Sequence, residues 1–74
     1  MNKITMDMIR TRVAYLNAIS KGTKFSIGGA YGGHRLERVY ENTGCKGYTP
    51  YTSKRELLNY INAFIDGIEF INNI

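Results

Sequence analysis

The chain has 74 residues and carries ten lysines and arginines against six aspartates and glutamates, which gives a net charge of +4. This length fits one domain over residues 1–74 with a thin core, so a homodimer or higher homo-oligomer is expected. The single Cys45 excludes an internal disulfide, the first residues do not resemble a signal peptide, and no segment reaches the roughly 18 apolar residues of a membrane span. These features predict a cytoplasmic protein without membrane contact.

A first helix is predicted near the start of the chain. Thr5 suits the N-cap position because its hydroxyl oxygen can accept an early backbone N–H, and Asp7 favours the positive end of the helix dipole. Apolar residues then recur at helical spacing, namely Ile9, Val13, Leu16 and Ile19. The helix is expected to end at Lys21 and Gly22, because glycine adopts the left-handed conformation that often closes a helix.

The middle of the chain predicts a small antiparallel sheet. Residues 24–31 alternate apolar with polar or small side chains, and residues 34–40 carry strand-forming residues on both faces. Gly32 and Gly33 between them suit a two-residue turn that needs positive φ. A short third strand is expected within residues 46–51, where a proline interrupts it.

A second, longer helix is the clearest predicted element. Ser53 and Glu56 form a capping box, in which the serine hydroxyl accepts an early N–H and the glutamate reaches back to the cap. The apolar stripe that follows consists of Leu57, Ile61, Phe64, Ile65, Ile68 and Ile71. This helix is expected to lie beside the first helix on one face of the sheet. The predicted fold class is α+β, a two-layer helix-strand-strand-(strand)-helix domain with a small antiparallel sheet covered by two helices.

His34 and Cys45 are the residues that could nominally serve as a base and a thiol nucleophile. No spacing identifies them as a pair and no third group orients them, so we expect a structural histidine and an incidental thiol. One histidine, one cysteine and scattered carboxylates also lack the clustered pattern of a zinc or calcium site. The sequence therefore predicts no enzymatic activity, no catalytic residues, no metal and no cofactor.

The glycines of residues 28–33 allow two interpretations. Backbone without side chains can approach a ligand closely and direct N–H groups at a phosphate. The stretch is not a P-loop, because no Gly-Lys-Ser or Gly-Lys-Thr follows, and it does not lead into the helix of a dinucleotide-binding unit. A sharply twisted hairpin, with or without a bulge, is the alternative.

Lys54 and Arg55 fall in the first turn of the second predicted helix, where the positive end of the helix dipole disfavours cations. A bound anion would relieve this conflict, since Ser53 and the first N–H groups of the helix could hold a phosphate. The alternative is that both cationic side chains extend into water beside Glu56.

Tyrosines accompany the cations of the middle segment. A tyrosine ring can stack on a base and its hydroxyl can bond a ribose or phosphate, whereas packing within the sheet is the alternative for each ring. The candidate ligand-binding residues are Tyr31, Gly32, Gly33, His34, Arg35, Arg38, Tyr51, Ser53, Lys54 and Arg55. We expect the hairpin and the start of the second helix to converge, so that their cations share one concave electropositive site.

Three segments of the chain resemble a group of short phage and prophage proteins. They are GAYGGHRLER at 29–38, SKREL at 53–57 and AFIDGI at 63–68, so the resemblance covers roughly residues 25–69. His34 departs from the group, which often carries an aromatic residue at this position. The resemblance implies a phage origin and, with it, a location in the host-cell cytoplasm.

Small phage proteins often counter bacterial defences, and one class consists of oligomeric sponges that bind nucleotide immune signals, including the ADP-ribose derivatives of Thoeris systems. The resemblance, taken with small size, positive charge and a middle rich in glycine and tyrosine, implies such a sponge. Its cations would neutralise phosphates while Tyr31 or Tyr51 stacks on a base or sugar, and no bond would be broken.

Two other functions stay open. Helix, three strands, helix is also the element order of double-stranded-RNA-binding domains, which use a strand-connecting loop and a basic start of the second helix. His34, Lys54 and Arg55 fall in these places, so a double-stranded nucleic acid is a candidate partner. The other candidate is a protein–protein inhibitor that occupies a host factor through an exposed sheet edge or a tyrosine surface.

Overall fold

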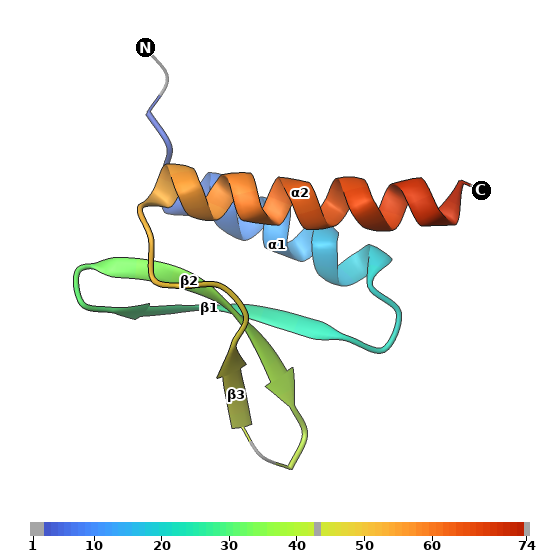
Figure 1. Cartoon of the computed structure of the whole chain (residues 1–74), viewed down its shortest axis with the longest axis horizontal. Helices are drawn as coiled ribbons and strands as arrows, with labels where there is room; N and C mark the ends of the chain where they lie inside the picture. The colour runs from blue at the N-terminus through green and yellow to red at the C-terminus, as the bar shows by residue number, and fades with distance from the viewer. Residues whose placement is uncertain (1–2, 43, 74) are drawn as a thin grey trace.

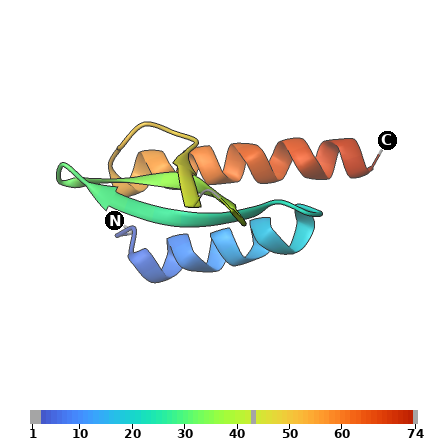
Figure 2. The same ribbon diagram turned by 90° about the horizontal axis from the view of Figure 1, so that it is seen from below.

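A computed structural model describes residues 3–42 and 44–73. Its elements are α1 (Met6–Ile19), β1 (Lys24–Ala30), β2 (Gly33–Tyr40), β3 (Gly44–Gly47) and α2 (Lys54–Asn72), as Figure 1 shows. The strands form one antiparallel sheet in the order β1-β2-β3. Both helices lie side by side on one face of this sheet (Figure 2), with α1 packed on β1 and α2 on β2. The predicted two-layer α+β fold is therefore confirmed.

The start of α1 confirms the predicted cap. The Thr5 side chain accepts a hydrogen bond from the Met8 backbone N–H at 3.3 Å. At the other end, the backbone N–H of the C-cap residue Ser20 donates to the Leu16 carbonyl, and Gly22 follows with φ +77°. The left-handed glycine lets the chain reverse into β1, as its place in the sequence predicts.

The start of α2 shows half of the predicted capping box. The Ser53 hydroxyl accepts a hydrogen bond from the Glu56 N–H at 3.2 Å. The return bond from the Glu56 carboxylate is not formed within the described part of the chain. Leu57, Ile61 and Ile65 of the apolar stripe are buried, and Phe64 and Ile68 are partly buried against the core, as predicted. Ile71 is 68% exposed, so its assignment to the stripe is wrong. The last turn of α2 runs beyond the end of α1 (Figure 1), and Phe70 and Ile71 there are mostly exposed.

The turn between β1 and β2 consists of Tyr31 and Gly32, one residue earlier than predicted. Ala30 and Gly33 form the last strand pair, and the two turn residues have φ values of +55° and +71°. Gly33 belongs to β2 because the backbone of Thr52 passes close to it: a Cβ on Gly33 would lie 3.1 Å from the Thr52 carbonyl oxygen. Glycine at position 33 therefore serves close approach, and of the two predicted turn glycines Gly32 alone lies in the turn.

The third strand covers Gly44–Gly47 rather than the predicted residues 46–51, and it pairs with the second half of β2. Beyond Gly47 the chain leaves the ladder, and the Tyr48 N–H donates to the Leu36 carbonyl oxygen at 2.8 Å. The Thr49 hydroxyl accepts the Leu36 N–H at 3.1 Å, in place of a strand carbonyl. A proline follows Thr49 and has no N–H with which to continue a ladder.

The core lies between the helix pair and the sheet. Its buried apolar side chains are Ile9, Val13, Leu16, Phe25, Leu36, Leu57, Ile61 and Ile65. At the free edge of β1, the Asn17 side-chain amide exchanges two hydrogen bonds with the backbone of Phe25, at 3.0 and 2.7 Å. Neither helix is long and apolar enough to cross a membrane, as far as the described residues extend.

Candidate functional site

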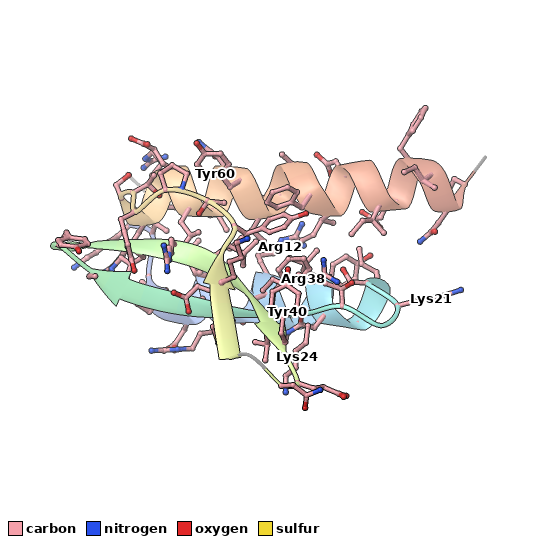
Figure 3. All side chains as sticks on the ribbon, turned by 60° about the horizontal axis from the view of Figure 1, so that its bottom comes forward. Arg12, Lys21, Lys24, Arg38, Tyr40 and Tyr60 are labelled. Atoms are coloured by element: carbon pink, nitrogen blue, oxygen red, sulfur yellow. The ribbon has the colours of Figure 1, made fainter. Side chains whose placement is uncertain are left out.

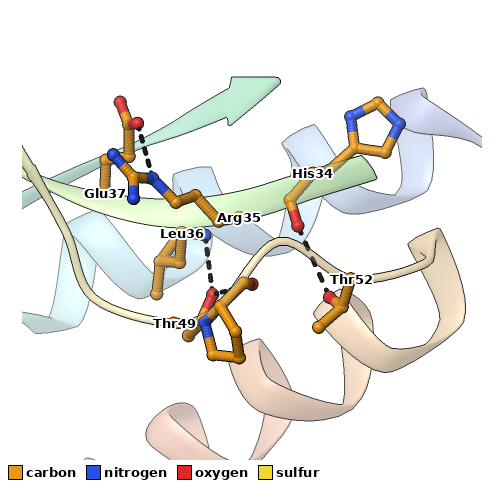
Figure 4. Close-up of polar contacts among 7 residues, drawn as sticks. His34, Arg35, Leu36, Glu37, Thr49 and Thr52 are labelled. Carbon is orange, nitrogen blue, oxygen red and sulfur yellow. Dashed lines mark hydrogen bonds and ion pairs between the residues drawn. The ribbon is translucent and has the colours of Figure 1, made fainter. Parts of the chain in front are cut away.

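The β1–β2 turn and the start of α2 meet at one end of the molecule. His34 and Thr52 exchange two backbone hydrogen bonds, with N···O distances of 2.9 and 2.7 Å. Thr52 directly precedes the N-cap of α2, so this bridge fixes the helix start against the hairpin. Figure 4 shows a further bond between the two residues, which the Thr52 hydroxyl donates to the His34 carbonyl oxygen. We call residues 31–35 and 51–55 the turn–helix end. It contains every predicted ligand-binding residue except Arg38.

Tyr31 is the most exposed side chain of the turn–helix end. Its ring is 93% exposed and contacts only the edge of the Tyr51 ring among described aromatic pairs, with centroids 5.4 Å apart. Its φ of +55° lies in the left-handed region, which costs a residue with a Cβ roughly 1–2 kcal/mol. Asn or Gly is the usual residue at such a position. The chain therefore presents a large aromatic ring to solvent from a backbone conformation that disfavours it.

Arg35 is held by two neighbours. Its Nε donates to Glu37 Oε2 at 2.9 Å, and its guanidinium carbon lies 4.4 Å from the centre of the Tyr51 ring. Arg35 and Glu37 lie on the face of β2 opposite Leu36, as Figure 4 shows. Room for it comes from glycines on both flanking strands, because a Cβ on Gly28 would collide with Glu37 and one on Gly47 with Arg35. Arg35 thus positions Tyr51, and its charge is balanced by Glu37.

Three glycines of the cluster have structural roles, and Gly29 has room for a side-chain carbon. Gly32 supplies a positive φ, and Gly33 gives room to the Thr52 backbone. Across the sheet, a Cβ on Gly29 would touch the His34 ring at 3.8 Å. Gly28 accommodates the Glu37 carboxylate. These contacts support the hairpin interpretation of the cluster over the phosphate cradle.

The start of α2 carries the unbalanced positive charge of the turn–helix end. Lys54 is half-buried and Arg55 is exposed, and the ion pairs formed between described residues involve neither of them. Ser53 satisfies only the Glu56 N–H, so the other amides of the first turn depend on solvent or a ligand. Two cations and the positive end of the helix dipole therefore face the same solvent.

A hollow of about 460 Å³ opens between the two helices, lined by Met8, Arg12, Leu58 and Asn62 among others. The Nε of Arg12 donates to the side-chain oxygen Oδ1 of Asn62 at 2.9 Å. Lys54 lies one turn before Leu58 on the same helical row but is not part of the lining of this hollow. Its lining includes no residue of the β1–β2 turn.

Arg38 lies at the other end of the molecule. It pairs across the sheet with Phe25 and Lys46, and it lines a hollow together with Asn72 near the end of α2. Lys54 and Asn72 are 18 residues apart on α2, which corresponds to about 27 Å of helix. Arg38 therefore does not share a site with the cations of the α2 start.

The chain has no significant match among protein-family models, curated proteins or solved structures. The resemblance to short phage proteins accordingly stays a prediction, and the functional argument depends on the geometry of the site. Within residues 3–42 and 44–73, no three side chains of histidine, cysteine, aspartate or glutamate gather into a group that could hold a metal ion.

Two residues that line the hollow beside Arg38 did not stand out in the sequence. Ser20 and Lys21 follow the end of α1 and reach Arg38 only through the packing of separate elements. No periodicity or motif connects residues so far apart along the chain. Their proximity could be found only from the fold.

Proposed function

We propose that the chain binds an anionic, nucleotide-like ligand at the turn–helix end and sequesters it without cleaving it. The observation that carries this proposal is the Tyr31 ring, which is 93% exposed and is held at φ +55° beside the start of α2. Backbone strain of this kind persists where function favours it. The ring offers a stacking surface, and Lys54 and Arg55 offer the charge that phosphates need.

Each group has a distinct role in this proposal. Lys54 and Arg55 bind the phosphates, assisted by the free N–H groups and the dipole at the start of α2. Tyr31 stacks on the base or sugar. Tyr51, held between Tyr31 and the Arg35 guanidinium, supports that ring from behind. Arg35 therefore acts on the ligand through Tyr51.

A second copy of the chain would complete the site. Tyr31 and Arg55 are exposed, so a ligand on a single copy stays in contact with water, which weakens charge-assisted bonds. Two copies facing one another would exclude that water. A sponge must bind its signal more tightly than the receptor does, which requires a Kd near nanomolar or about −12 kcal/mol. The phage resemblance implies an ADP-ribose-like immune signal as the ligand. Such a molecule has phosphates for Lys54 and Arg55 and a base and sugars for Tyr31.

Calorimetric titration with ADP-ribose, NAD⁺ and ATP tests this proposal. We expect at least one of them to bind, and the double variant K54Q/R55Q to weaken binding about tenfold or more, because the phosphate loses both cations. Lys24→Gln removes one positive charge from β1, half of the change in the double variant, and is the control for general electrostatics, with binding expected within about twofold of the unchanged protein. No binding of any of the three, or equal losses in both variants, would overturn the proposal. Native mass spectrometry of the mixture reports the number of copies per ligand.

Duplex nucleic acid is the second candidate ligand, because the strand order brings the start of α1, the β1–β2 turn and the start of α2 to one end. Double-stranded-RNA-binding domains use the same order of elements. Binding to duplex RNA would weaken steeply with added salt, since each phosphate contact releases a counterion. Tight, stoichiometric binding of a small nucleotide with little duplex binding favours the first proposal.

A further inference from the structure

Two adjoining hollows lie at the end of the molecule away from the β1–β2 turn. The larger, of about 340 Å³, is lined by Ser20, Lys21, Phe25, Arg38, Tyr48 and Ile68, among others. The smaller, of about 250 Å³, shares Arg38 and Tyr48 with it and adds Tyr40 and Lys46. We call the two together the Arg38 hollow. In Figure 3, Lys21 marks its α1 side and Arg38 and Tyr40 its β2 side.

The charge of the Arg38 hollow is one-sided. Lys21, Arg38 and Lys46 line it, and the ion pairs formed between described residues involve none of the three. The described lining includes no aspartate or glutamate. Lys21 alone has a structural reason for its place, because a cation just beyond a helix C-terminus is favoured by the dipole. Arg38 and Lys46 lie on strands, where no helix dipole offsets their charge.

A buried hydroxyl in the same lining lacks a partner. Ser20 Oγ is shielded from solvent and forms no hydrogen bond with any described residue. Buried polar groups in folded proteins nearly always have a partner, so an unsatisfied one needs an explanation. A molecule the size of water does not reach Ser20 Oγ in this conformation, so a ligand in the hollow supplies the missing bond once the side chain turns toward it. Ser20 lines the hollow beside Lys21, so one anionic group could then contact both.

The opposite wall is aromatic and fixed. Tyr48 contacts the Phe25 ring at 5.5 Å and the Phe64 ring at 5.3 Å between centroids, yet 51% of it stays exposed. The Arg38 guanidinium lies over the Tyr40 ring at 4.9 Å, which holds this cation in the wall between the two hollows. A ring placed here would find an apolar surface next to a fixed positive charge.

From these features we infer that the Arg38 hollow is a second binding site, which takes a small phosphate monoester with an aromatic body. Lys21, Arg38 and the Ser20 hydroxyl bind the phosphate, while Tyr48 and Phe25 contact the ring. The α2 residues that line the site, Ile68 and Asn72, lie about 21 and 27 Å along the helix from Lys54, so the site functions whether or not the turn–helix end binds a nucleotide.

Phenyl phosphate is a suitable probe, followed by amide NMR shifts in the intact chain. We expect saturable shifts at Lys21, Arg38 and Tyr48, with inorganic phosphate binding more weakly and benzyl alcohol weakest. Shifts confined to residues 31–35 and 51–55 would overturn this inference while supporting the turn–helix proposal. If phenyl phosphate and inorganic phosphate bind with equal affinity, the aromatic wall has no role in binding. If phenyl phosphate and benzyl alcohol bind with equal affinity, the cations have no role in binding.

Variants separate this site from general electrostatics. Arg38→Gln and Lys21→Gln are each expected to weaken phenyl phosphate binding about tenfold. Lys24→Gln is the matched control, because Lys24 adjoins Phe25 on β1 and its side chain points to the opposite face of the sheet. It should keep affinity within about twofold. Thermal melting checks each fold, and equal affinity in all three variants would refute the site.

Discussion

His34 and Thr52 exchange both of their backbone hydrogen bonds, although 18 residues separate them in the sequence. The exchange extends the edge of β2 by one pair beyond the point where β3 has left it. Since Thr52 is followed at once by the N-cap Ser53, the hairpin and the start of α2 are held as one unit. Any change that separates Gly33 from Thr52 should therefore disturb both.

Gly33→Ala tests this coupling. The new Cβ would lie 3.1 Å from the Thr52 carbonyl oxygen and 3.3 Å from its nitrogen, and backbone atoms cannot rotate away. We expect the free energy of unfolding to fall by about 1–3 kcal/mol, the usual cost of overpacking. Urea denaturation measures this change.

Gly29→Ala is the matched control for that measurement. Its nearest neighbour would be the Gly33 carbonyl oxygen at an ordinary 3.7 Å, and Gly29 lies within β1 without a positive φ. Alanine is favoured over glycine inside a strand, so stability should be unchanged or raised by up to about 1 kcal/mol. Equal losses in both variants would show that the Thr52 contact is not what makes Gly33 necessary.

Tyr31→Asn separates folding from binding at the turn. Asparagine tolerates the positive φ, so this variant removes roughly 1 kcal/mol of backbone strain. It also loses the aromatic contact with Tyr51, which contributes about 0.5–1.5 kcal/mol to stability. These two effects nearly cancel, so the free energy of unfolding should change by less than about 1 kcal/mol. Calorimetry with the nucleotide that binds best should show about a tenfold loss of affinity. Retained affinity would mean that the exposed ring is not a ligand contact.

The helices and the fold class could be predicted from the sequence because their signals are local. Thr5 and Ser53 occupy the N-cap positions as predicted, and the apolar residues at helical spacing, apart from Ile71, are buried or partly buried. The turn was predicted one residue late because both Gly32 and Gly33 suit a positive φ, and only the passage of Thr52 shows which one is needed for space. The third strand was misplaced because Thr49 replaces a ladder carbonyl with its hydroxyl, and composition carries no signal of this.

The candidate site was partly predictable for the same reason. In an antiparallel sheet, the β1–β2 turn and the start of α2 fall at the same end, so their convergence follows from the element order. Arg38 was grouped with them because of its closeness in sequence, yet it lies four residues further along an extended strand than His34, about 13 Å away. The balance of Arg35 by Glu37 also depends on room left by glycines on neighbouring strands.

Thr49→Val tests the hydroxyl that replaces a ladder partner. Thr49 is 7% exposed, and replacing its hydroxyl by the methyl group of valine would leave the Leu36 N–H buried without an acceptor. We expect a loss of about 1–3 kcal/mol in urea denaturation and faster hydrogen exchange at the Leu36 amide. Thr49→Ser keeps the oxygen and loses one methyl group, which costs about 1 kcal/mol and leaves the amide protected. Fast exchange in the serine variant as well would contradict this account.

The link between Tyr15 and Glu69 should make stability depend on pH in the alkaline range. The Tyr15 hydroxyl donates to Glu69 Oε2 at 2.6 Å, joining α1 to α2, and this bond together with the nearby negative charge raises the pKa of Tyr15 above its usual 10.0. The folded chain therefore holds the proton more tightly than the unfolded chain. The stabilisation is complete below pH 10.0 and is lost as the pH rises through the raised pKa of the folded state.

Urea denaturation of the unchanged chain and of Tyr15→Phe, at a series of pH values, measures this dependence. The difference in unfolding free energy between the two should be constant at neutral pH and shrink above pH 10.0. Tyr60→Phe is the control, because the Tyr60 hydroxyl takes no part in the side-chain hydrogen bonds found among described residues. A difference for Tyr15→Phe that stays constant through the alkaline range would show that the bond to Glu69 does not contribute to holding α1 against α2.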